Sequence, residues 1–428
     1  MASSPLIDRP AGAALFHTQD GPVDAGRFLA DAAEIAGRLP AGDYILNVCR
    51  DRYRFATTLA AGLLAGRVSL LCGDPSASVV AGLVERFAGT AVVGDGEAEG
   101  APGGAVPAMP QIAGDRLVAI VFTSGSTGAP VAHPKHWAAL VARSRAAGER
   151  FGLFETEPAS IVGTVPPGHM YGLETTVLLP FHAACAAWCG PAFFAADVQS
   201  ALEAVPKPRV LVTTPLQLRN LATLTPPPLQ AIISATAPLD TALAGAVEAR
   251  WSSPVFEIFG ATECGSVATR RTAETESWLP YEGVSLHEGA AGPFVRAAFA
   301  ADTPLADAVE LAADGSFRLL GRRTDLVKMG GRRASLAGLN EILTGLEGVR
   351  DGVFVVPDDL DRRSTARLVA VVVAPGRTVA GLLADLRERI DPVFLPRRLI
   401  QVEALPRNSL GKLPREALLD LLRTRDAA

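Results

Sequence analysis

Short apolar runs alternate with helical segments through most of the sequence, and this alternation limits the fold more than any other feature. Residues 43–49 and 67–72 are strand-like runs, and residues 52–66 between them have the spacing of a helix. Further strand-like runs occupy residues 160–165, 209–214, 230–236 and 254–260. Strands that alternate with helices pair mostly in parallel. The sequence therefore predicts an α/β fold, in which a large N-terminal domain has mostly parallel sheets flanked by helices.

The C-terminal part of the sequence follows a different pattern. Shorter strand-like pieces begin after Tyr281, and residues 340–422 form a compact α+β pattern. Its strands are expected at residues 351–357 and 367–375, and its helices at residues 379–390 and 414–425. A segment of this size can fold as a separate domain. We therefore expect an N-terminal domain over residues 1–322 and a small C-terminal α+β domain over residues 323–428.

Composition narrows the range of partners. The chain has 428 residues, of which 49% are hydrophobic, and it carries 40 basic side chains against 45 acidic ones. Because neither sign dominates and no long charged run occurs, we expect no nucleic-acid partner. Neither a signal peptide nor membrane insertion is expected, since no apolar segment is long enough to span a bilayer. The five cysteines show no paired spacing beyond one C-x-x-x-C (Cys185 and Cys189), with no second pair to complete a zinc site, which favours buried free thiols in a reducing cytoplasm.

A loop rich in hydroxyl groups and glycine directly follows the apolar run at residues 117–122. Glycines let several backbone N–H groups converge, and hydroxyl side chains add further donors, so the loop suits a polyphosphate. Its candidate ligand residues are Thr123, Ser124, Gly125, Ser126, Thr127 and Gly128. Most such clusters are ordinary loops, and no Gly-Lys-Ser/Thr follows, which excludes the P-loop of kinases and GTPases. The phosphate interpretation therefore depends on support from other segments.

Four separated motifs supply that support. In chain order they are TSGSTGAP at residues 123–130, FGATE at 259–263, GRRTDLVKMGGRR at 321–333 and PRNSLGK at 406–412. In this order and rough spacing the chain, from about Leu117 to its end, resembles the adenylate-forming superfamily. That superfamily contains acyl-CoA synthetases, adenylation domains that load carrier proteins, and luciferases. The short ligases that load acyl or aryl carrier proteins are the subgroup that this compact chain resembles.

The resemblance implies two half-reactions. A carboxylate attacks the α-phosphorus of ATP to give an acyl-adenylate and pyrophosphate, and a thiol then displaces AMP. Glu263 is matched to the carboxylate that holds Mg²⁺ on ATP, and Thr262 to a donor to the α-phosphate. The other residues matched to nucleotide contacts are Gly260 and Ala261 of the same motif, Ser234, Ala235 and Thr236 beside adenine, and Asp307 on the ribose hydroxyls.

The resemblance also assigns three residues near the reacting groups. Lys412 and Arg322 are matched to cations near the nucleotide, where the flexible ammonium of Lys412 reaches the substrate carboxylate and the α-phosphate. His169 is matched to the residue that gates the acyl pocket, although a hydrogen-bonded loop histidine is the alternative. Family members present two faces of the C-terminal domain in turn. We therefore expect residues 323–428 to be a mobile domain that rotates about a hinge near Thr324, with Gly331 lining the path of the thiol.

Two departures from the superfamily pattern refine the expectation. Val131 stands where most members have a lysine that touches the terminal phosphates, and Lys135 is the candidate to replace it. Met170 and Tyr171 follow His169, where domains that activate amino acids usually have an aspartate for the α-ammonium group. The substrate is therefore expected to lack an α-amino group.

The leading hypothesis is an acid–thiol ligase that uses ATP and Mg²⁺ to activate an aromatic or medium-chain carboxylic acid. Its acceptor is CoA or the phosphopantetheine of an acyl carrier protein. Two alternatives stay open at this point. One is an adenylate-forming enzyme with a non-thiol acceptor, and the other is a catalytically degenerate protein that binds nucleotide or acyl groups. The charged residues Glu263, Asp307, Arg322 and Lys412 argue against the degenerate protein.

Overall fold

The structure of the chain is a computed structural model. It describes residues 2–73, 75–96, 108–123, 131–154, 157–322, 326–329, 332–356, 368–407 and 413–426. The chain packs as two units, one comprising Met1–Leu286 with Val295–Thr303 and the other His287–Phe294 with Pro304–Ala428. The second unit includes residues 304–322, which the sequence had placed in the larger domain. The expected boundary after residue 322 stays a prediction.

A nine-stranded sheet is the centre of the first unit. In spatial order its strands are β16 (Leu279–Pro280), β15 (Gly265–Arg271), β14 (Val255–Ala261), β13 (Ala231–Ser234), β12 (Arg209–Thr213), β10 (Ala159–Gly163), β11 (Cys185–Trp188), β2 (Ala14–Thr18) and β3 (Gly21–Asp24). The strands from β14 to β2 are parallel, and β15, β16 and β3 are antiparallel additions at the edges. This arrangement confirms the α/β class that the alternation predicted.

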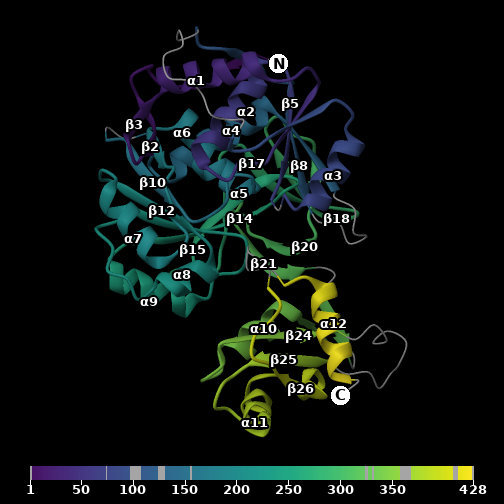
Figure 1. Cartoon of the computed structure of the whole chain (residues 1–428). Helices are drawn as coiled ribbons and strands as arrows, with labels where there is room; N and C mark the ends of the chain where they lie inside the picture. Colours follow the sequence, from purple (N-terminus) through teal and green to yellow (C-terminus); the bar gives the residue numbers. More distant parts are fainter. Residues whose placement is uncertain are drawn as a thin grey trace. The chain divides into compact units, whose positions relative to one another are not determined.

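Three helices pack on one face of this sheet, as Figure 1 shows beside β12. They are α7 (Ala195–Ala204), α8 (Pro215–Leu221) and α9 (Thr241–Trp251). Their apolar faces share one hydrophobic cluster with β10, β12, β13 and β14, in which Leu202, Leu218 and Val247 are buried. Helices α8 and α9 begin at the N-cap residues Thr214 and Asp240, whose side chains accept from the backbone of the first turn. These caps fix the point where each strand–turn–helix connection ends.

A five-stranded sheet carries the first predicted β-α-β unit. In spatial order it contains β6 (Thr90–Val93), β4 (Tyr44–Asn47), β5 (Val68–Cys72), β8 (Leu117–Thr123) and β9 (Val131–His136). Its strands are parallel except for β9, which turns back antiparallel on β8. The helices of this region are α1 (Ala25–Arg38), α2 (Arg52–Leu64), α3 (Ala77–Arg86) and α4 (Trp137–Arg150), and a small sheet pairs β1 (Ser3–Pro5) with β7 (Gln111–Ala113).

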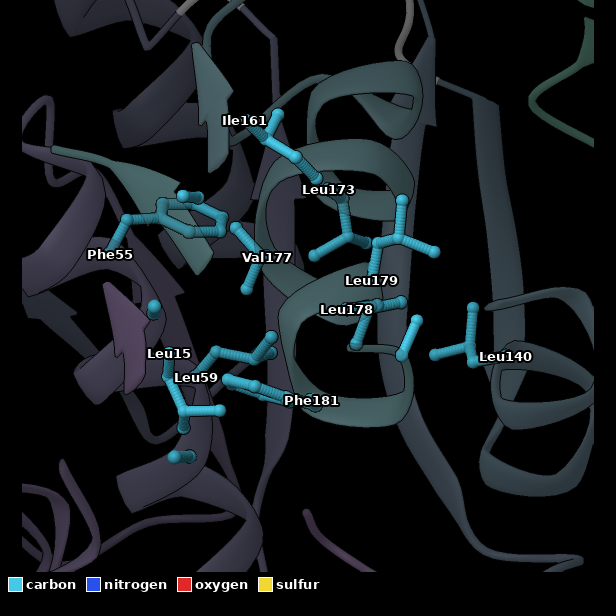
Figure 2. Packing of buried hydrophobic residues seen from close by; sticks show 14 of the residues in the cluster. Leu15, Phe55, Leu59, Leu140, Ile161, Leu173, Val177, Leu178, Leu179 and Phe181 are labelled. Carbon is cyan, nitrogen blue, oxygen red and sulfur yellow. The ribbon is translucent and has the colours of Figure 1, made fainter. Parts of the chain in front are cut away.

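One helical stretch runs through the core of the first unit and widens in its middle. It consists of α5 (Met170–Leu173), a π-helical segment η1 (Glu174–Leu178) and α6 (Leu179–His182). Its apolar side chains, among them Leu173, Val177 and Phe181, pack against Phe55 and Leu59 of α2, as Figure 2 shows. The π turn precedes Pro180, which has no N–H to donate and would interrupt a regular helical ladder. The first residue of the π-helical segment, Glu174, is a buried carboxylate.

The second unit has a small core of its own. Its three-stranded sheet has the order β24 (Asp351–Val355), β25 (Val369–Val373) and β26 (Arg398–Gln401). Its helices are α10 (Leu336–Thr344), α11 (Val379–Arg389), the short η2 (Pro392–Phe394) and α12 (Arg415–Asp426). Leu343, Val372 and Leu386 are fully buried in its main cluster. The strands and helices expected in the C-terminal part of the sequence are thus confirmed.

Short strands make up the remaining segments. A three-stranded sheet orders β17 (Val284–Gly289), β18 (Gly292–Ala297) and β19 (Thr303–Pro304), and two hairpins pair β20 (Asp307–Leu311) with β21 (Phe317–Arg322) and β22 (Leu326–Met329) with β23 (Arg332–Ser335). All five cysteines are free thiols, four of them buried and Cys264 half-buried. Across the ranges that the structure describes, no helix is both long and apolar enough to cross a membrane.

Candidate nucleotide and acyl site

The carboxyl ends of neighbouring parallel strands bring several predicted site residues to one edge of the large sheet. Strands β12, β13 and β14 are adjacent and parallel, with Thr213 opposite Ser234 and Ser234 opposite Glu257. Ala235 and Thr236 directly follow β13, while Gly260 and Ala261 end β14 and are followed by Thr262 and Glu263. Ligands of open α/β sheets bind at this edge. The sequence-predicted adenine segment and the GATE motif therefore lie on neighbouring strands.

Two hydroxyl groups of the adenine segment are buried without a partner. Among the residues that the structure describes, neither Ser234 Oγ nor Thr236 Oγ1 makes a hydrogen bond. Leaving such a group unpaired costs about 1–3 kcal/mol. Thr236 also has φ = +83°, a left-handed conformation that is strained for a β-branched residue. Unpaired hydroxyls and strained backbone are common at ligand sites, where a ligand can supply the missing hydrogen bonds. This segment therefore fits a nucleotide.

A buried glutamate that sequence reasoning missed holds this segment in place. Glu257 of β14 accepts from the backbone N–H of Leu239 at 2.8 Å and from Thr272 Oγ1 at 2.9 Å. Arg270 of β15 pairs with the same carboxylate at 2.7 Å. Burial raises the pKa of Glu257, and the charge of Arg270 opposes that shift. A charged residue inside an apolar strand was the available signal, because buried acids are nearly always paired.

The turn that carries Thr262 and Glu263, called the GATE turn below, is held by the buried side chains of Lys135 and Glu174. Lys135 of β9 donates its ammonium to the carbonyl oxygens of Thr262 and, at 2.9 Å, of Glu263. The carboxylate of Glu174 accepts from the backbone N–H of Ser266 at 3.2 Å and from its hydroxyl. Burial lowers the pKa of Lys135 and raises that of Glu174. The exposed side chain of Glu263 thus projects from a backbone that is anchored on both sides.

The position of Lys135 differs from its expected role. The sequence nominated Lys135 to replace a phosphate-binding lysine, yet its side chain is only 7% exposed and donates to backbone carbonyls. Contact with ATP phosphates therefore stays a prediction without support from these contacts. Sequence reasoning also did not identify Glu174, although a glutamate within the apolar run at residues 170–181 was the signal that could have found it.

The phosphate-loop hairpin is described only at its base. Thr123 ends β8 and pairs with Val131 of β9, and its hydroxyl lies 2.9 Å from His133 Nε2. Burial lowers the pKa of His133. The loop residues Ser124, Gly125, Ser126, Thr127 and Gly128 lie outside the described residues, so their phosphate role stays a prediction. What the structure adds is that this loop joins the strand that delivers Lys135 to the GATE turn.

His169 is positioned at the N-terminus of α5. Its Nδ1 accepts from the backbone N–H of Tyr171 at 3.2 Å. The preceding strand end is held by Arg52, whose guanidinium donates to the carbonyls of Gly163 and Val165. A side chain at Gly73 would approach the His169 ring at 3.7 Å, which places the ring beside the end of β5. His169 therefore caps a helix and stands between the two sheets, and its gating role stays a prediction.

The second unit brings together two other predicted site residues. Asp307 opens β20 and pairs directly with Arg322, the last residue of β21. Two residues nominated from the sequence are thus paired along the backbone of one hairpin. Lys412, Thr324 and Gly331 lie outside the described residues. Their catalytic and hinge roles stay predictions.

A magnesium ion requires oxygen ligands, which the GATE motif supplies through Glu263. Over the ranges that the structure describes, no group of three or more His, Cys, Asp or Glu side chains could hold a metal ion. Magnesium in nucleotide sites is usually held by one or two carboxylates together with the phosphates of the substrate. Glu263, exposed on an anchored turn, meets that requirement. The residues therefore fit a magnesium ion that arrives with ATP.

Comparison with known proteins identifies a matching family and two related CoA ligases. Residues 43–289 match the AMP-binding enzyme family. The 4-coumarate–CoA ligase of Rhodobacter capsulatus is 29% identical over 302 residues, which cover 69% of this chain and 74% of that protein. A probable 2-succinylbenzoate–CoA ligase of Mycobacterium tuberculosis is 28% identical over 334 residues, which cover 71% of this chain and 84% of that protein.

Solved structures share the fold over nearly the whole chain. The o-succinylbenzoate CoA synthetase of Bacillus subtilis, in complex with its acyl-adenylate intermediate, has a TM-score of 0.82 at 18% identity and covers 98% of both chains. ATP-bound MatB from Rhodopseudomonas palustris has a TM-score of 0.78 at 19% identity and covers 97% of both chains. At these identities the likeness establishes the fold, and it confirms the fold class predicted from the alternation of strands and helices.

Proposed function

The chain belongs to the AMP-binding enzyme family, and from that premise we propose that it activates a carboxylic acid with ATP and transfers the acyl group to a thiol. In the first step a carboxylate oxygen attacks the α-phosphorus, and the bond from that phosphorus to the pyrophosphate oxygen breaks. In the second step a thiolate attacks the acyl carbonyl carbon, and AMP leaves with the electrons of its bond to that carbon. No oxidant or reductant is required.

The observation that carries this proposal is the pair of unpaired buried hydroxyls next to the anchored GATE turn. Ser234 and Thr236 offer hydrogen bonds at the end of β13 that no described residue takes. Thr262 and Glu263 follow the adjacent strand β14, close enough in the sheet to serve the same ligand. A base or ribose at β13 and phosphates at the turn after β14 would use both sets. This arrangement supports a nucleotide that spans the two strand ends.

The remaining roles are those that the superfamily resemblance implies. Thr262 donates to the α-phosphate, and Glu263 holds the magnesium ion, which neutralises phosphate charge when bound. Asp307 accepts from the ribose hydroxyls, and Arg322 and Lys412 supply positive charge to the nucleotide and the substrate carboxylate. Thr123 begins the loop that holds the terminal phosphates.

The proposed acid is an aromatic or medium-chain carboxylic acid without an α-amino group. Tyr171, which stands where an ammonium-binding aspartate is usual, donates its hydroxyl to the carbonyls of Thr213 and Ile233 at 3.1 and 2.9 Å. Its hydroxyl is therefore already hydrogen-bonded to the ends of β12 and β13, and the side chain supplies no negative charge for the α-ammonium group of an amino acid. The relatives named as ligases of 4-coumarate and 2-succinylbenzoate support an aromatic acid.

CoA is the acceptor that the curated relatives favour, because they are named as CoA ligases. The phosphopantetheine arm of an acyl carrier protein presents the same thiol and is the other acceptor to be tested. The decisive experiment measures ATP–pyrophosphate exchange across a panel of aromatic, aliphatic and amino acids, followed by thioester formation with CoA and with carrier protein. Exchange with a non-amino acid and thioester formation are expected.

Other results of that experiment would point elsewhere. Exchange without thioester formation on either thiol would favour an adenylate-forming enzyme with a different acceptor. No exchange with any acid, while ATP still binds, would overturn the proposed enzyme in favour of a nucleotide- or acyl-binding protein.

A further inference from the structure

We propose that Lys135 and Glu174 are positioning residues that together clamp the turn at residues 260–266 and so aim the Glu263 carboxylate at magnesium-bound ATP. The turn lies between β14 and β15 and carries Thr262 and Glu263. The inference rests on the proposed function for its catalytic consequence. Its structural part, the clamp itself, can be tested on the protein without ligands.

One side of the clamp is Lys135. The β8–β9 hairpin delivers this lysine, which lies opposite Ala119 of β8 and points into the protein. Its ammonium donates to two successive carbonyl oxygens of the turn, those of Thr262 and Glu263. An ammonium has three donors and no acceptor, so it suits carbonyl groups that no strand pairs. Lys135 therefore holds the backbone of the two residues proposed to contact phosphate and metal.

The other side of the clamp is Glu174. The π-helical segment presents this carboxylate, 7% exposed, to the start of β15. It accepts from the backbone N–H of Ser266 and from the Ser266 hydroxyl. Gly265 makes the contact possible, because its φ is +73° and an added Cβ would lie 2.6 Å from Glu174 Oε1. The downstream end of the turn is thus fixed to the helical stretch that begins at His169.

The two side chains depend on each other electrostatically. The negative charge of Glu174 favours the charged form of Lys135, and Lys135 and Arg143 of α4 favour the charged form of Glu174. Arg143 is itself buried and opposes the charge of Lys135. Removing one member of a buried charge set leaves the others uncompensated. The clamp therefore behaves as a unit, which connects the phosphate-loop hairpin, the His169 helix and the GATE turn.

The clamp also explains why Lys135 is buried, which direct phosphate binding does not. Each anchor grips backbone atoms, so the side chain of Glu263 stays exposed while its main chain is fixed. Catalytic groups must be held close to their productive geometry by supporting contacts of this kind. Loss of either anchor is expected to weaken the magnesium site without removing a ligand from it.

The first experiment measures amide hydrogen exchange of the ligand-free protein over residues 262–266. Lys135→Met should exchange on the order of tenfold faster there because it removes one anchor of the turn, and Glu174→Gln should do the same because a neutral amide weakens the charge-assisted hydrogen bonds to Ser266. Lys207→Met and Glu85→Gln, the same chemical changes at exposed positions, should match the wild type. Lys135→Arg keeps donors and charge and should largely restore protection. Should Lys135→Met fail to fold, Glu174→Gln, which keeps an acceptor for Ser266, carries the test.

The second experiment measures the Mg²⁺ concentration for half-maximal ATP–pyrophosphate exchange. Both clamp variants should need roughly tenfold more Mg²⁺, and the double variant little more than either, because they act through one turn. In a Glu263→Gln background the same substitutions should not raise the Mg²⁺ requirement further, since no carboxylate is left to aim.

The outcomes separate the possible explanations. If Lys135→Met weakens ATP use at an unchanged Mg²⁺ requirement and Val131→Lys restores it, Lys135 binds phosphate and the proposal is wrong. Unchanged exchange protection at residues 262–266 in both variants would equally overturn the clamp. If the wild type shows no ATP–pyrophosphate exchange with any acid, the proposed function fails, while hydrogen exchange still decides whether the two residues hold the turn.

Discussion

At the scale of single residues, the site is marked by groups whose local state is unfavourable in the protein alone. Thr236 combines a left-handed backbone with a buried hydroxyl that no described residue satisfies. Ser234, fully buried on the preceding strand, has the same unpaired hydroxyl. Strained or unsatisfied residues persist where surrounding structure holds them, and they cluster at ligand sites. At these two residues we therefore expect that the features that favour ligand binding lower the stability of the ligand-free protein.

The first prediction tests that expectation at Thr236. Thr236→Gly removes the strain of a left-handed threonine and should raise the free energy of unfolding by roughly 1 kcal/mol. The same change removes a hydroxyl that is available to the nucleotide, so ATP binding should weaken. Urea unfolding and ATP titration measure the two effects. A variant that is both less stable and unchanged in ATP affinity would contradict the assignment.

The second prediction concerns a histidine remote from the site. Burial lowers the pKa of His182 to about 3 from its ordinary value of 6.5. Between these values the unfolded chain binds a proton that the folded chain cannot, so stability is complete above pH 6.5 and falls as the pH drops. The slope is about 1.4 kcal/mol per pH unit.

Comparison with His182→Phe isolates this effect, because the variant keeps an aromatic ring beside Trp137. From pH 7 to pH 5 the wild type should lose about 2 kcal/mol more unfolding free energy than the variant. Urea unfolding at both pH values provides the measurement. Equal losses in the two proteins would show that His182 is not held neutral.

At the scale of elements, the turn between β14 and β15 depends on a glycine. Gly265 has a positive φ and leaves no room for a side chain beside Glu174. The hairpin is also irregular between Phe259 and Gly260, where the register of the two strands shifts. Such irregularities redirect side chains near functional sites. The shape of the turn therefore depends on the positive φ of Gly265 and on the register shift at Gly260, and substitution of Gly265 should disturb it.

The third prediction uses a matched pair of glycines. Gly66 has φ = +78° with nothing within 4 Å of an added Cβ, whereas at Gly265 (φ = +73°) the Cβ would meet Glu174. Ala at either position carries a backbone penalty of about 1–2 kcal/mol. Gly265→Ala should cost more than Gly66→Ala and should alone raise the Mg²⁺ requirement. Thermal unfolding and Mg²⁺ titration of both variants check this, and equal behaviour would mean that the Glu174 contact does not shape the turn.

At the scale of the whole molecule, each unit has its own hydrophobic core. The first contains Phe55, Ile161 and Phe181 in its largest cluster, and the second contains Leu343 and Leu386. Predicted site residues are divided between the units, since Glu263 belongs to the first and Asp307 to the second. Because the reaction has two half-reactions, substitutions at residues that serve only one of them should separate the two.

The fourth prediction makes that separation at Lys412. The superfamily resemblance implies that Lys412 serves adenylate formation and that the residue matched by Gly331 serves thioester formation. Lys412→Ala should therefore lose acyl-adenylate synthesis but still convert supplied acyl-adenylate to thioester. Gly331→Trp should show the reverse. Measuring both half-reactions in both variants decides the matter, and equal loss of both halves in folded Lys412→Ala would rule out this division of labour.

The sequence alone determined the fold class, the main elements and the family. Helix and strand periodicity is local, so the β-α-β unit at residues 43–72 and the strands expected at residues 160–165, 209–214 and 230–236 could be identified from short windows. Motif order then indicated the family, because glycines, hydroxyls and charges at fixed spacings restrict the backbone and its ligand together. The segment at residues 234–236, which we propose to contact the nucleotide, and the GATE motif were nominated in this way.

Only the tertiary structure decided how that site is held. Lys135 meets the carbonyl of Glu263 across 128 positions, and Glu174 meets Ser266 across 92. No local pattern encodes such pairs, because a charged side chain in the sequence carries no record of which distant backbone group it will satisfy. Burial in the folded protein determines the partner, because a charge removed from water must be paired or hydrogen-bonded there. For that reason the sequence could name Lys135 but assigned it to phosphate, and it passed over Glu174 and Glu257.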